Sequence, residues 1–254
     1  MPVMIGIAVL TALFSAVLAS FFMTMACRAA AGRGWRACLG GRSRCDGCGH
    51  LLAARDMIPV FSFLVLRGGC RYCAAPVGMA VFGAEAVSFF LGIISALLLR
   101  GGDIALAAVL GAALSALAAC DWRSGFLPDI LTFPLLLAGL LLSLAGMGPP
   151  PEEALIGAVA GFAALRLVAL LYRWVRGREG LGGGDAFLLA AAGAWLGWRW
   201  LALVVLLGAL GTLVGALLWH ILARRRLDAT AELPFGPGLC AAVWLCWLLA
   251  RGGG

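Results

Sequence analysis

Apolar residues in this chain come in long uninterrupted runs, without the alternation of a strand or the one-sided stripe of a soluble helix. Runs of roughly 18 or more apolar residues are typical of membrane-spanning helices. The pattern therefore predicts an all-α polytopic membrane protein with about eight transmembrane helices. The expected spans are 2–26, 77–99, 104–120, 129–147, 154–175, 186–198, 201–222 and 236–250.

Two of these segments need comment. The segment 186–198 is short for a full crossing, so we expect its helix to begin before Asp185 or to end after Trp200. The first segment has no basic residue ahead of it and is too long for the apolar part of a signal peptide. We therefore expect it to be a retained first span.

Composition supports the membrane interpretation. The chain has 254 residues, of which 63% are hydrophobic and 12% are charged, whereas soluble domains carry roughly a quarter charged residues. A soluble fold of this length has too little interior to bury so much apolar surface. Soluble classes are thereby excluded.

The basic residues are all arginines, and they lie mostly between the apolar segments. Fifteen of them fall on one set of alternate loops and three on the other, which predicts that the richer side faces the cytoplasm. The N-terminus and, with an even number of spans, the C-terminus would then face outside. Loop charge of this kind explains the net charge of +7 without nucleic-acid binding. The richer side holds Arg28, Arg33, Arg36, Arg42, Arg44, Arg55, Arg67, Arg71, Arg123, Arg173, Arg176, Arg178 and Arg224 to Arg226; the poorer side holds Arg100, Arg199 and Arg251.

Arg166 differs from the other arginines because it falls inside the predicted span 154–175. A long basic side chain at this depth either extends toward the membrane surface or serves a role within the helix bundle. The sequence leaves both interpretations open.

Four of the nine cysteines form two Cys-x2-Cys pairs, Cys45 with Cys48 and Cys70 with Cys73. This spacing predicts a four-thiolate zinc site, structural in role because four thiolates leave no open coordination position. Disulfides and a thioredoxin-like redox pair are weaker alternatives in a cytoplasmic loop. His50 is a possible substitute ligand. A loop of about 50 residues with little apolar content needs such a crosslink to fold.

A few acidic residues lie at or within the spans, where charge is costly and therefore usually functional. Asp121 follows the third span, Asp129 begins the fourth, Asp185 begins the sixth, and Glu85 lies inside the second. Two aspartates held close together share a proton and can act as an acid–base pair on a peptide bond. For Asp121 and Asp185 this competes with simple solvation at the interface, whereas Asp129, after a proline, fits N-capping or support. The glycines before Asp185 would allow close backbone approach and unusual dihedral angles.

Four ordered motifs resemble those of the type IV prepilin peptidases, also called leader peptidase–methyltransferases. The resemblance covers nearly the whole chain. The motifs are the segment from Ile58 to Cys73 around the second cysteine pair, the segment from Asp121 through Leu127-Pro128-Asp129 to Pro134, the GxGD segment from Arg178 to Asp185, and the PFGP turn from Leu233 to Pro237.

The resemblance implies that Asp121 and Asp185 are the catalytic pair. We expect Asp129, Gly182, Gly184 and Glu85 to have substrate-binding or supporting roles. It implies a bacterial inner-membrane enzyme that cuts the leader from a prepilin or pseudopilin at the cytoplasmic face. S-adenosylmethionine would serve as cosubstrate for methylation of the new N-terminus. The expected parts are a first helix over 1–26, a zinc-binding cytoplasmic loop over 27–76 and a peptidase domain over 77–254.

The chain departs from the family pattern at two positions: Phe187 stands where lysine usually follows the GxGD aspartate, and Gly69 stands before the third zinc cysteine in place of lysine. Two other functions remain as alternatives. One is a GxGD peptidase for other membrane substrates, and the other is a non-catalytic, zinc-stabilised membrane scaffold or transporter. The sequence does not predict the oligomeric state.

Overall fold

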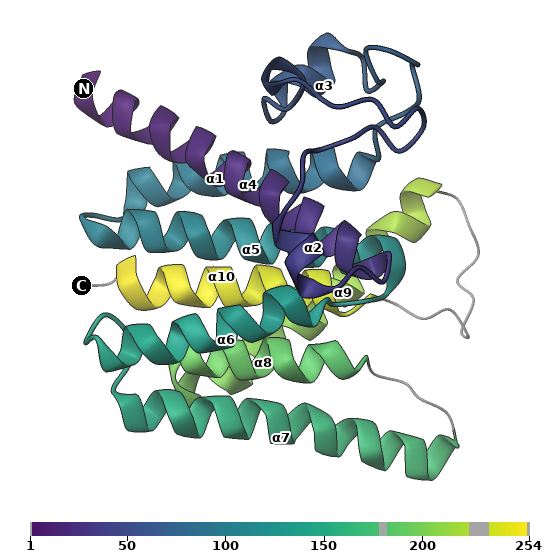
Figure 1. Cartoon of the computed structure of the whole chain (residues 1–254). Helices are drawn as coiled ribbons and strands as arrows, with labels where there is room; N and C mark the ends of the chain where they lie inside the picture. Colours follow the sequence, from purple (N-terminus) through teal and green to yellow (C-terminus); the bar gives the residue numbers. More distant parts are fainter. Residues whose placement is uncertain (1, 178–181, 224–233, 253–254) are drawn as a thin grey trace. The chain divides into compact units, whose positions relative to one another are not determined.

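The computed structural model describes residues 2–177, 182–223 and 234–252. Each of the eight predicted spans coincides with an α-helix (Figure 1). The described ranges contain no β-strand, only two isolated bridges, so the all-α prediction is confirmed. The helices are α1 (Pro2–Ala30), α2 (Trp35–Leu39), α3 (Phe61–Val65), α4 (Met79–Leu98), α5 (Gly102–Ser124), α6 (Asp129–Leu144), α7 (Pro151–Arg176), α8 (Gly183–Leu196), α9 (Leu201–Ala223) and α10 (Gly236–Gly252), with short 3-10 turns η1 (Ala54–Asp56) and η2 (Trp198–Trp200).

Five of the described helices, α1, α4, α5, α7 and α9, are long and apolar enough to cross a membrane. The apolar helices α6, α8 and α10 are shorter. Helix α8 begins two residues before Asp185, as expected for a segment whose apolar run alone was too short. The chain forms two compact units, Met1–Cys120 and Asp121–Gly254.

In the first unit, α1 and α4 lie side by side (Figure 1). Small and polar side chains lie at their contact. A Cβ atom on Gly92 would lie 2.8 Å from the Cα atom of Ala12, so only glycine permits this approach. The buried hydroxyls of Ser15 and Ser88 are 2.7 Å apart, and Ser15 also donates to the carbonyl oxygen of Ala108 at 3.2 Å. Close backbone approach and interhelical hydrogen bonds are what hold helices together in lipid, where apolar burial contributes little.

In the second unit, α8 is the central helix and packs against α6, α7, α9 and α10. Its residues are small or apolar all around, which is typical of a helix buried on every side. The Trp195 indole N–H donates to the carbonyl oxygen of Leu135 at 2.8 Å and so satisfies the polar atom of this large buried side chain. Gly139 leaves room for the indole, since a Cβ there would lie 2.5 Å from its ring.

The contact between α7 and α8 depends on glycine. Gly157 and Gly161 lie one turn apart on α7 and are both buried. A Cβ on Gly157 would lie 2.5 Å from the carbonyl oxygen of Gly193, and one on Gly161 would lie 2.5 Å from that of Leu189. The two backbones are therefore in direct contact, and this contact positions the helix that carries Asp185.

Large apolar side chains point outward along α1, α7 and α9. Leu206, Leu213 and Leu222 of α9, for example, are 55%, 62% and 81% exposed. Exposed apolar surface on this scale is stable only against lipid or another apolar partner. It is the surface expected of a membrane-embedded helix bundle.

We predict that Gly161→Leu separates α7 from α8 and lowers the free energy of unfolding by about 1–3 kcal/mol or more, because the side chain would overlap backbone atoms. The matched control is Gly6→Leu on α1, where a Cβ meets no atom within 4 Å. Thermal unfolding of the purified variants in detergent measures the difference. Equal midpoints for the two variants would contradict the glycine contact.

Candidate active site and metal centre

Asp121 lies in the last turn of α5, and its side chain is buried, with 7% exposure for the residue. Its Oδ2 atom accepts a hydrogen bond of 2.9 Å from the backbone N–H of Gly236, the first residue of α10. A Cβ on Gly236 would lie 2.6 Å from the same oxygen. Glycine is therefore required for the N-terminus of α10 to approach the acid, and the free N–H groups of a helix N-terminus favour negative charge on it.

Asp185 is the third residue of α8 and is also buried, with 6% exposure. Its Oδ1 atom is buried and has no hydrogen-bond partner among the residues that the structure describes. Gly184 sets the position of this turn, because a Cβ there would lie 2.6 Å from the Cβ of Leu127. A buried carboxyl oxygen without a partner is uncommon in proteins and indicates a site where a proton or a ligand is expected.

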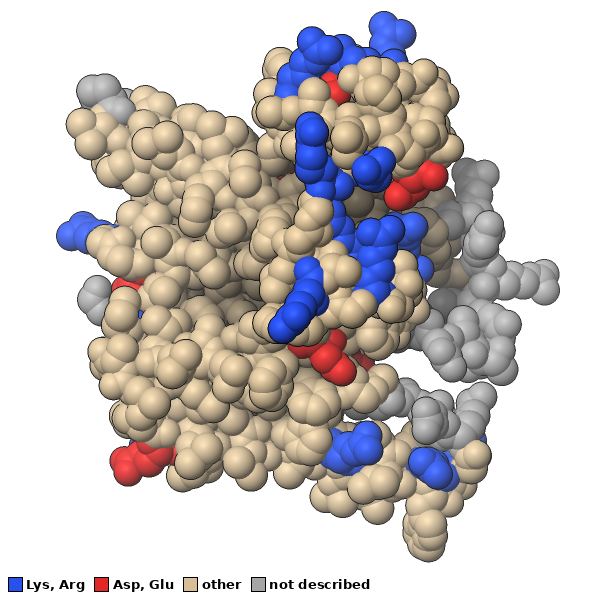
Figure 2. Space-filling model, viewed as in Figure 1, with Lys and Arg blue, Asp and Glu red and all other residues tan. Residues whose placement is uncertain are grey.

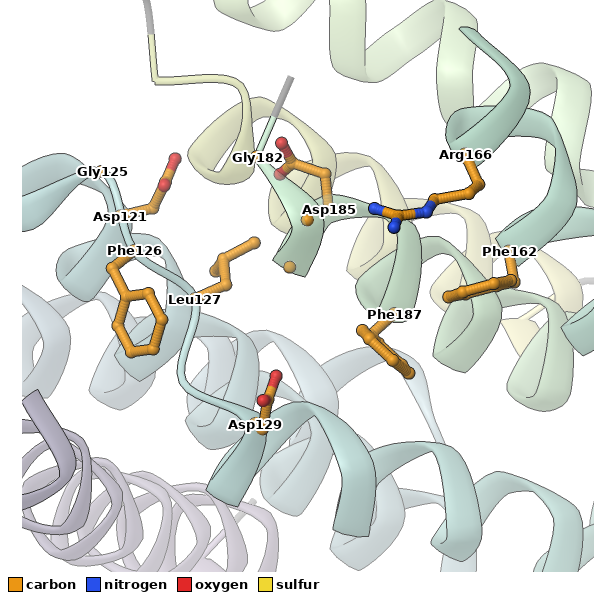
Figure 3. A pocket seen from close by; sticks show the side chains of 12 residues that line it. Asp121, Gly125, Phe126, Leu127, Asp129, Phe162, Arg166, Gly182, Asp185 and Phe187 are labelled. Atoms are coloured by element: carbon orange, nitrogen blue, oxygen red, sulfur yellow. The ribbon is translucent and has the colours of Figure 1, made fainter. Parts of the chain in front are cut away.

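The two aspartates line one pocket of about 380 Å³, a volume within the range of ligand sites (Figure 3). Asp129, Arg166, Phe162 and Phe187 also line it. Like charges held in one desolvated pocket cannot both ionise readily, so two carboxyls in this setting are able to act as an acid and a base. The pocket thus brings together Asp121, Asp129, Asp185, Gly182 and Gly184, all of which the sequence singled out.

Two details of the sequence interpretation are wrong. Gly182 has ordinary extended dihedral angles and none of Gly182 to Gly184 has a positive φ, so the expected unusual backbone conformation is not found. Close approach holds for Gly184, whereas a Cβ on Gly183 would meet no atom within 4 Å. Pro128 occupies the N-cap of α6, which places Asp129 at the first helical position. There a negative charge interacts favourably with the helix dipole, but the Asp129 side chain does not cap a backbone N–H. The first part of the GxGD motif, Arg178 to Leu181, and Leu233 of the PFGP turn lie outside the described residues.

The four cysteines of the two pairs form one cluster in the loop between α1 and α4. Their sulfur atoms all lie within 4.8 Å of one another, and the Sγ atoms of Cys45 and Cys73 are 3.7 Å apart. Zinc–sulfur bonds of about 2.3 Å in a tetrahedron place sulfur atoms about 3.8 Å apart. The cluster can therefore hold a metal ion, and its donor set suits zinc. His50 is outside the cluster, and its ring packs on Tyr72 with centroids 3.6 Å apart.

The two cysteine pairs are built alike. In each, a backbone N–H two residues after the first cysteine donates to its sulfur, Gly47 to Cys45 at 3.4 Å and Tyr72 to Cys70 at 3.5 Å. An isolated antiparallel bridge closes each turn, Arg44 with Leu51 and Gly69 with Pro76. The repeated turn is what presents two sulfurs from each pair to a common point.

Two thiols of the cluster differ in acidity. Hydrogen bonds from the backbone of Cys48 and Gly47 lower the pKa of Cys45 to about 7. The backbone of Ala75 acts in the same direction on Cys73, but the neighbouring cysteines raise the pKa of that thiol to about 12. One thiolate forms easily and the last one with difficulty, so a bound dication is what would hold all four in the ligating form.

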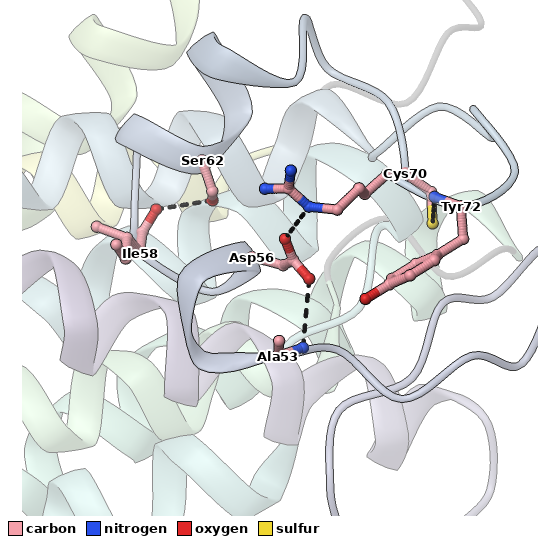
Figure 4. Close-up of polar contacts among 7 residues, drawn as sticks. Ala53, Asp56, Ile58, Ser62, Cys70 and Tyr72 are labelled. Carbon is pink, nitrogen blue, oxygen red and sulfur yellow. Dashed lines mark hydrogen bonds and ion pairs between the residues drawn. The ribbon is translucent and has the colours of Figure 1, made fainter.

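An ion pair joins the second cysteine turn to the rest of the loop (Figure 4). The Arg71 Nε atom donates to Oδ1 of Asp56 at 2.6 Å, and the backbone N–H of Ala53 donates to Oδ2 at 3.3 Å. The Arg71 guanidinium holds the pKa of Asp56 below its usual value. Figure 2 shows basic side chains gathered over this loop, in contrast to the uncharged faces of α1 and α4.

Comparison with known proteins identifies the family. The profile of the "Type IV leader peptidase family" matches residues 112–219, and that of the "Bacterial Peptidase A24 N-terminal domain" matches residues 13–99. A prepilin leader peptidase/N-methyltransferase of Dickeya chrysanthemi is 41% identical over 201 residues, which are 79% of this chain and 70% of the relative. The chain belongs to the type IV leader peptidase family.

Other relatives carry the same name. The protein of Burkholderia pseudomallei (strain 1026b) is 45% identical over 79% of this chain, and that of Pseudomonas aeruginosa is 36% identical over 81% of it. The matched part is 64% of the length of the Burkholderia relative and 71% of the Pseudomonas one. No solved structure matches the chain. These matches do not favour the scaffold, transporter or other-substrate alternatives, and with the apolar helices they support a multi-pass inner-membrane protein.

Glu85, one of the support residues expected from the resemblance to the leader peptidases, has a defined contact within the first unit. It is buried on α4, and its Oε2 atom accepts a hydrogen bond of 2.8 Å from the backbone N–H of Val60. Val60 has φ 62° and ψ −50° at the centre of a γ-turn closed by a 2.6 Å bond from Phe61 N–H to Pro59 carbonyl. This conformation is strained for a β-branched residue. The carboxylate on α4 therefore helps to hold a strained turn of the cysteine loop.

Sequence reasoning did not find the partners of these acids. The PFGP turn was noted as a motif, but its glycine was not linked to Asp121. For Glu85 the sequence does indicate that a partner exists, since a carboxyl group inside an apolar span requires a hydrogen-bond donor. Which donor meets it depends on the fold.

We predict that Cys45→Ser lowers bound zinc well below one equivalent per chain, because three thiolates and a hydroxyl bind zinc more weakly. Cys38→Ser is the matched control: it lies in the same loop but outside the cluster, and serine can keep its hydrogen bond to the Arg33 carbonyl. Elemental analysis of the purified proteins gives the metal content. Full zinc in Cys45→Ser would overturn the four-thiolate site.

We predict that Glu85→Ala lowers the free energy of unfolding by about 1–3 kcal/mol, because the part-buried Val60 N–H loses its acceptor. Glu85→Gln keeps a carbonyl oxygen in the same place and should cost less. Thermal unfolding in detergent compares the two variants. If alanine and glutamine have the same effect, the hydrogen bond to Val60 is not what Glu85 contributes.

Proposed function

We propose that this chain is a membrane-embedded aspartyl endopeptidase that removes the leader from prepilins or pseudopilins. The observation that carries the proposal is the pocket shared by Asp121 and Asp185, two buried carboxyls on different helices. The substrate class is taken from the names of the relatives. The cut would fall at the cytoplasmic face, with the cysteine loop in the cytoplasm and both chain termini outside, as the arginine distribution favours.

The two acids differ in ways that suggest separate roles. The Gly236 N–H stabilises negative charge on Asp121, whereas Oδ1 of Asp185 has no partner. The shared proton is therefore best placed on Asp185. Asp121 would accept a proton from water, the resulting nucleophile would add to the peptide carbonyl carbon, and Asp185 would donate its proton to the carbonyl oxygen. Return of a proton to the amine releases the leader and the new N-terminus.

Two further components belong to the proposal. Zinc would be held by Cys45, Cys48, Cys70 and Cys73 and would stabilise the loop without taking part in the reaction. N-methylation of the new N-terminus, with S-adenosylmethionine as methyl donor, follows from the names of the relatives. We assign no residue to S-adenosylmethionine.

The test is cleavage of a purified prepilin by the protein in detergent, with the new N-terminus read by mass spectrometry. We predict that Asp121→Asn and Asp185→Asn each lower kcat by at least about 100-fold, since each removes one partner of the acid–base pair. Glu152→Gln, which changes an exposed acid at the start of α7, is the control and should leave the rate unchanged.

Asp129→Asn separates support from catalysis. It should lower the rate by less than either member of the pair, because Asp129 lines the pocket as the first residue of α6 and is not assigned a proton-transfer step. Wild-type rates in both Asp121→Asn and Asp185→Asn would overturn the proposed function. Zinc content and unfolding midpoint show that each variant is folded.

A further inference from the structure

Arg166 is a charged residue deep in a membrane helix. It lies on α7 about 15 Å from the helix's last residue, taking 1.5 Å per residue. An arginine at such depth is costly unless it faces a polar cavity or reaches the membrane surface. Figure 3 shows its guanidinium directed toward the side of the pocket where Asp185 lies.

The charges around this pocket are unequal. Asp121 comes from α5, Asp129 from α6 and Asp185 from α8, and Arg166 is the single basic residue among the described residues that line it. No ion pair between Arg166 and a described residue is formed, so its guanidinium is available to the pocket as a whole. Asp121 and Asp185 are buried, whereas Asp129 and Arg166 are exposed. A cation that lines the same pocket as two buried acids influences which of them is ionised.

Phe187 occupies the part of the pocket where α8 meets α7. It lines the same pocket, two residues after Asp185, and its ring packs on Phe162 with centroids 5.1 Å apart. Phe162 lies one turn before Arg166 on the same helix. The side of the pocket formed by α7 and α8 therefore consists of a phenylalanine pair with a guanidinium beside it. Position 187 is also where this chain departs from the family pattern, with phenylalanine in place of lysine.

We propose that Arg166 is a positioning residue that supplies the positive charge of the two-aspartate pocket from α7, in place of a cation at position 187 on α8. The inference rests on the proposed peptidase function. The guanidinium stabilises the ionised member of the pair, so that one carboxylate is available as base near neutral pH. Removing it favours protonation of the pair and moves the whole rate–pH profile to higher pH.

The test exchanges the two positions. Arg166→Gln should lower kcat at pH 7 about tenfold and shift the rate–pH profile upward by about one pH unit. Arg166→Lys should keep most of the activity. In the double variant Arg166→Gln with Phe187→Lys, the charge returns to the pocket from α8, and both the rate and the profile should recover toward wild type. Phe187→Lys alone measures the effect of a second cation.

Arg176→Gln, in the last turn of α7 and outside the pocket lining, is the matched control and should behave as wild type. The inference is overturned if Arg166→Gln cleaves prepilin with an unchanged rate and profile, which is the result expected of an arginine that only reaches the membrane surface. It is also overturned if the double variant is no more active than Arg166→Gln, since charge is then not the property that matters. A wild-type protein that cuts no prepilin would instead overturn the peptidase function, and this inference with it.

Discussion

A carboxyl group placed among apolar helices is stabilised by hydrogen-bond donors, and for Asp121 and Glu85 backbone N–H groups supply them. Helix N-termini are the places where such groups remain unpaired in a helix bundle. Asp121 uses the first N–H of α10, and Glu85 uses the N–H of Val60 at the start of α3. The fold therefore has to place helix ends next to the acids. Much of the helix packing in the second unit serves this purpose.

Glycine makes this arrangement possible. Gly236 and Gly184 lie where a helix start meets Asp121 or Leu127, and a single added carbon at either position would collide with its neighbour. Gly157 and Gly161 allow an equally close approach between the backbones of α7 and α8. Packing in lipid depends on close contact more than on apolar burial. These glycines are therefore important for helix packing although they have no side chains.

The helices themselves were predictable from the sequence because lipid leaves the backbone few alternatives. A long apolar run has to satisfy its own N–H and C=O groups, so each run becomes a helix near its predicted bounds. The cysteine cluster was predictable for a similar reason, since its spacing fits one coordination geometry. Asp121 and Asp185 were recognised by motif, and the fold places both in one pocket.

What the sequence could not predict are the pairings between distant segments. Nothing local to Gly236 indicates that its N–H meets a residue 115 positions earlier. The strained turn at Val60 cannot be predicted locally, because the carboxylate that accepts the hydrogen bond from its N–H lies on α4. The direction of the Arg166 side chain, which lines the pocket, depends on the packing of α7, and the sequence alone leaves two directions open.

The contrast between α8 and α9 has a consequence for how such a protein can change over evolutionary time. Most of α8 is buried against other helices, and at Gly193 even one methyl group would meet the backbone of α7. Most large side chains of α9 face outward, where leucine, valine and isoleucine are nearly equivalent to a lipid neighbour. Neutral drift should accumulate quickly along α9 and hardly at all along α8, so the number of substitutions in a helix would record its distance from lipid.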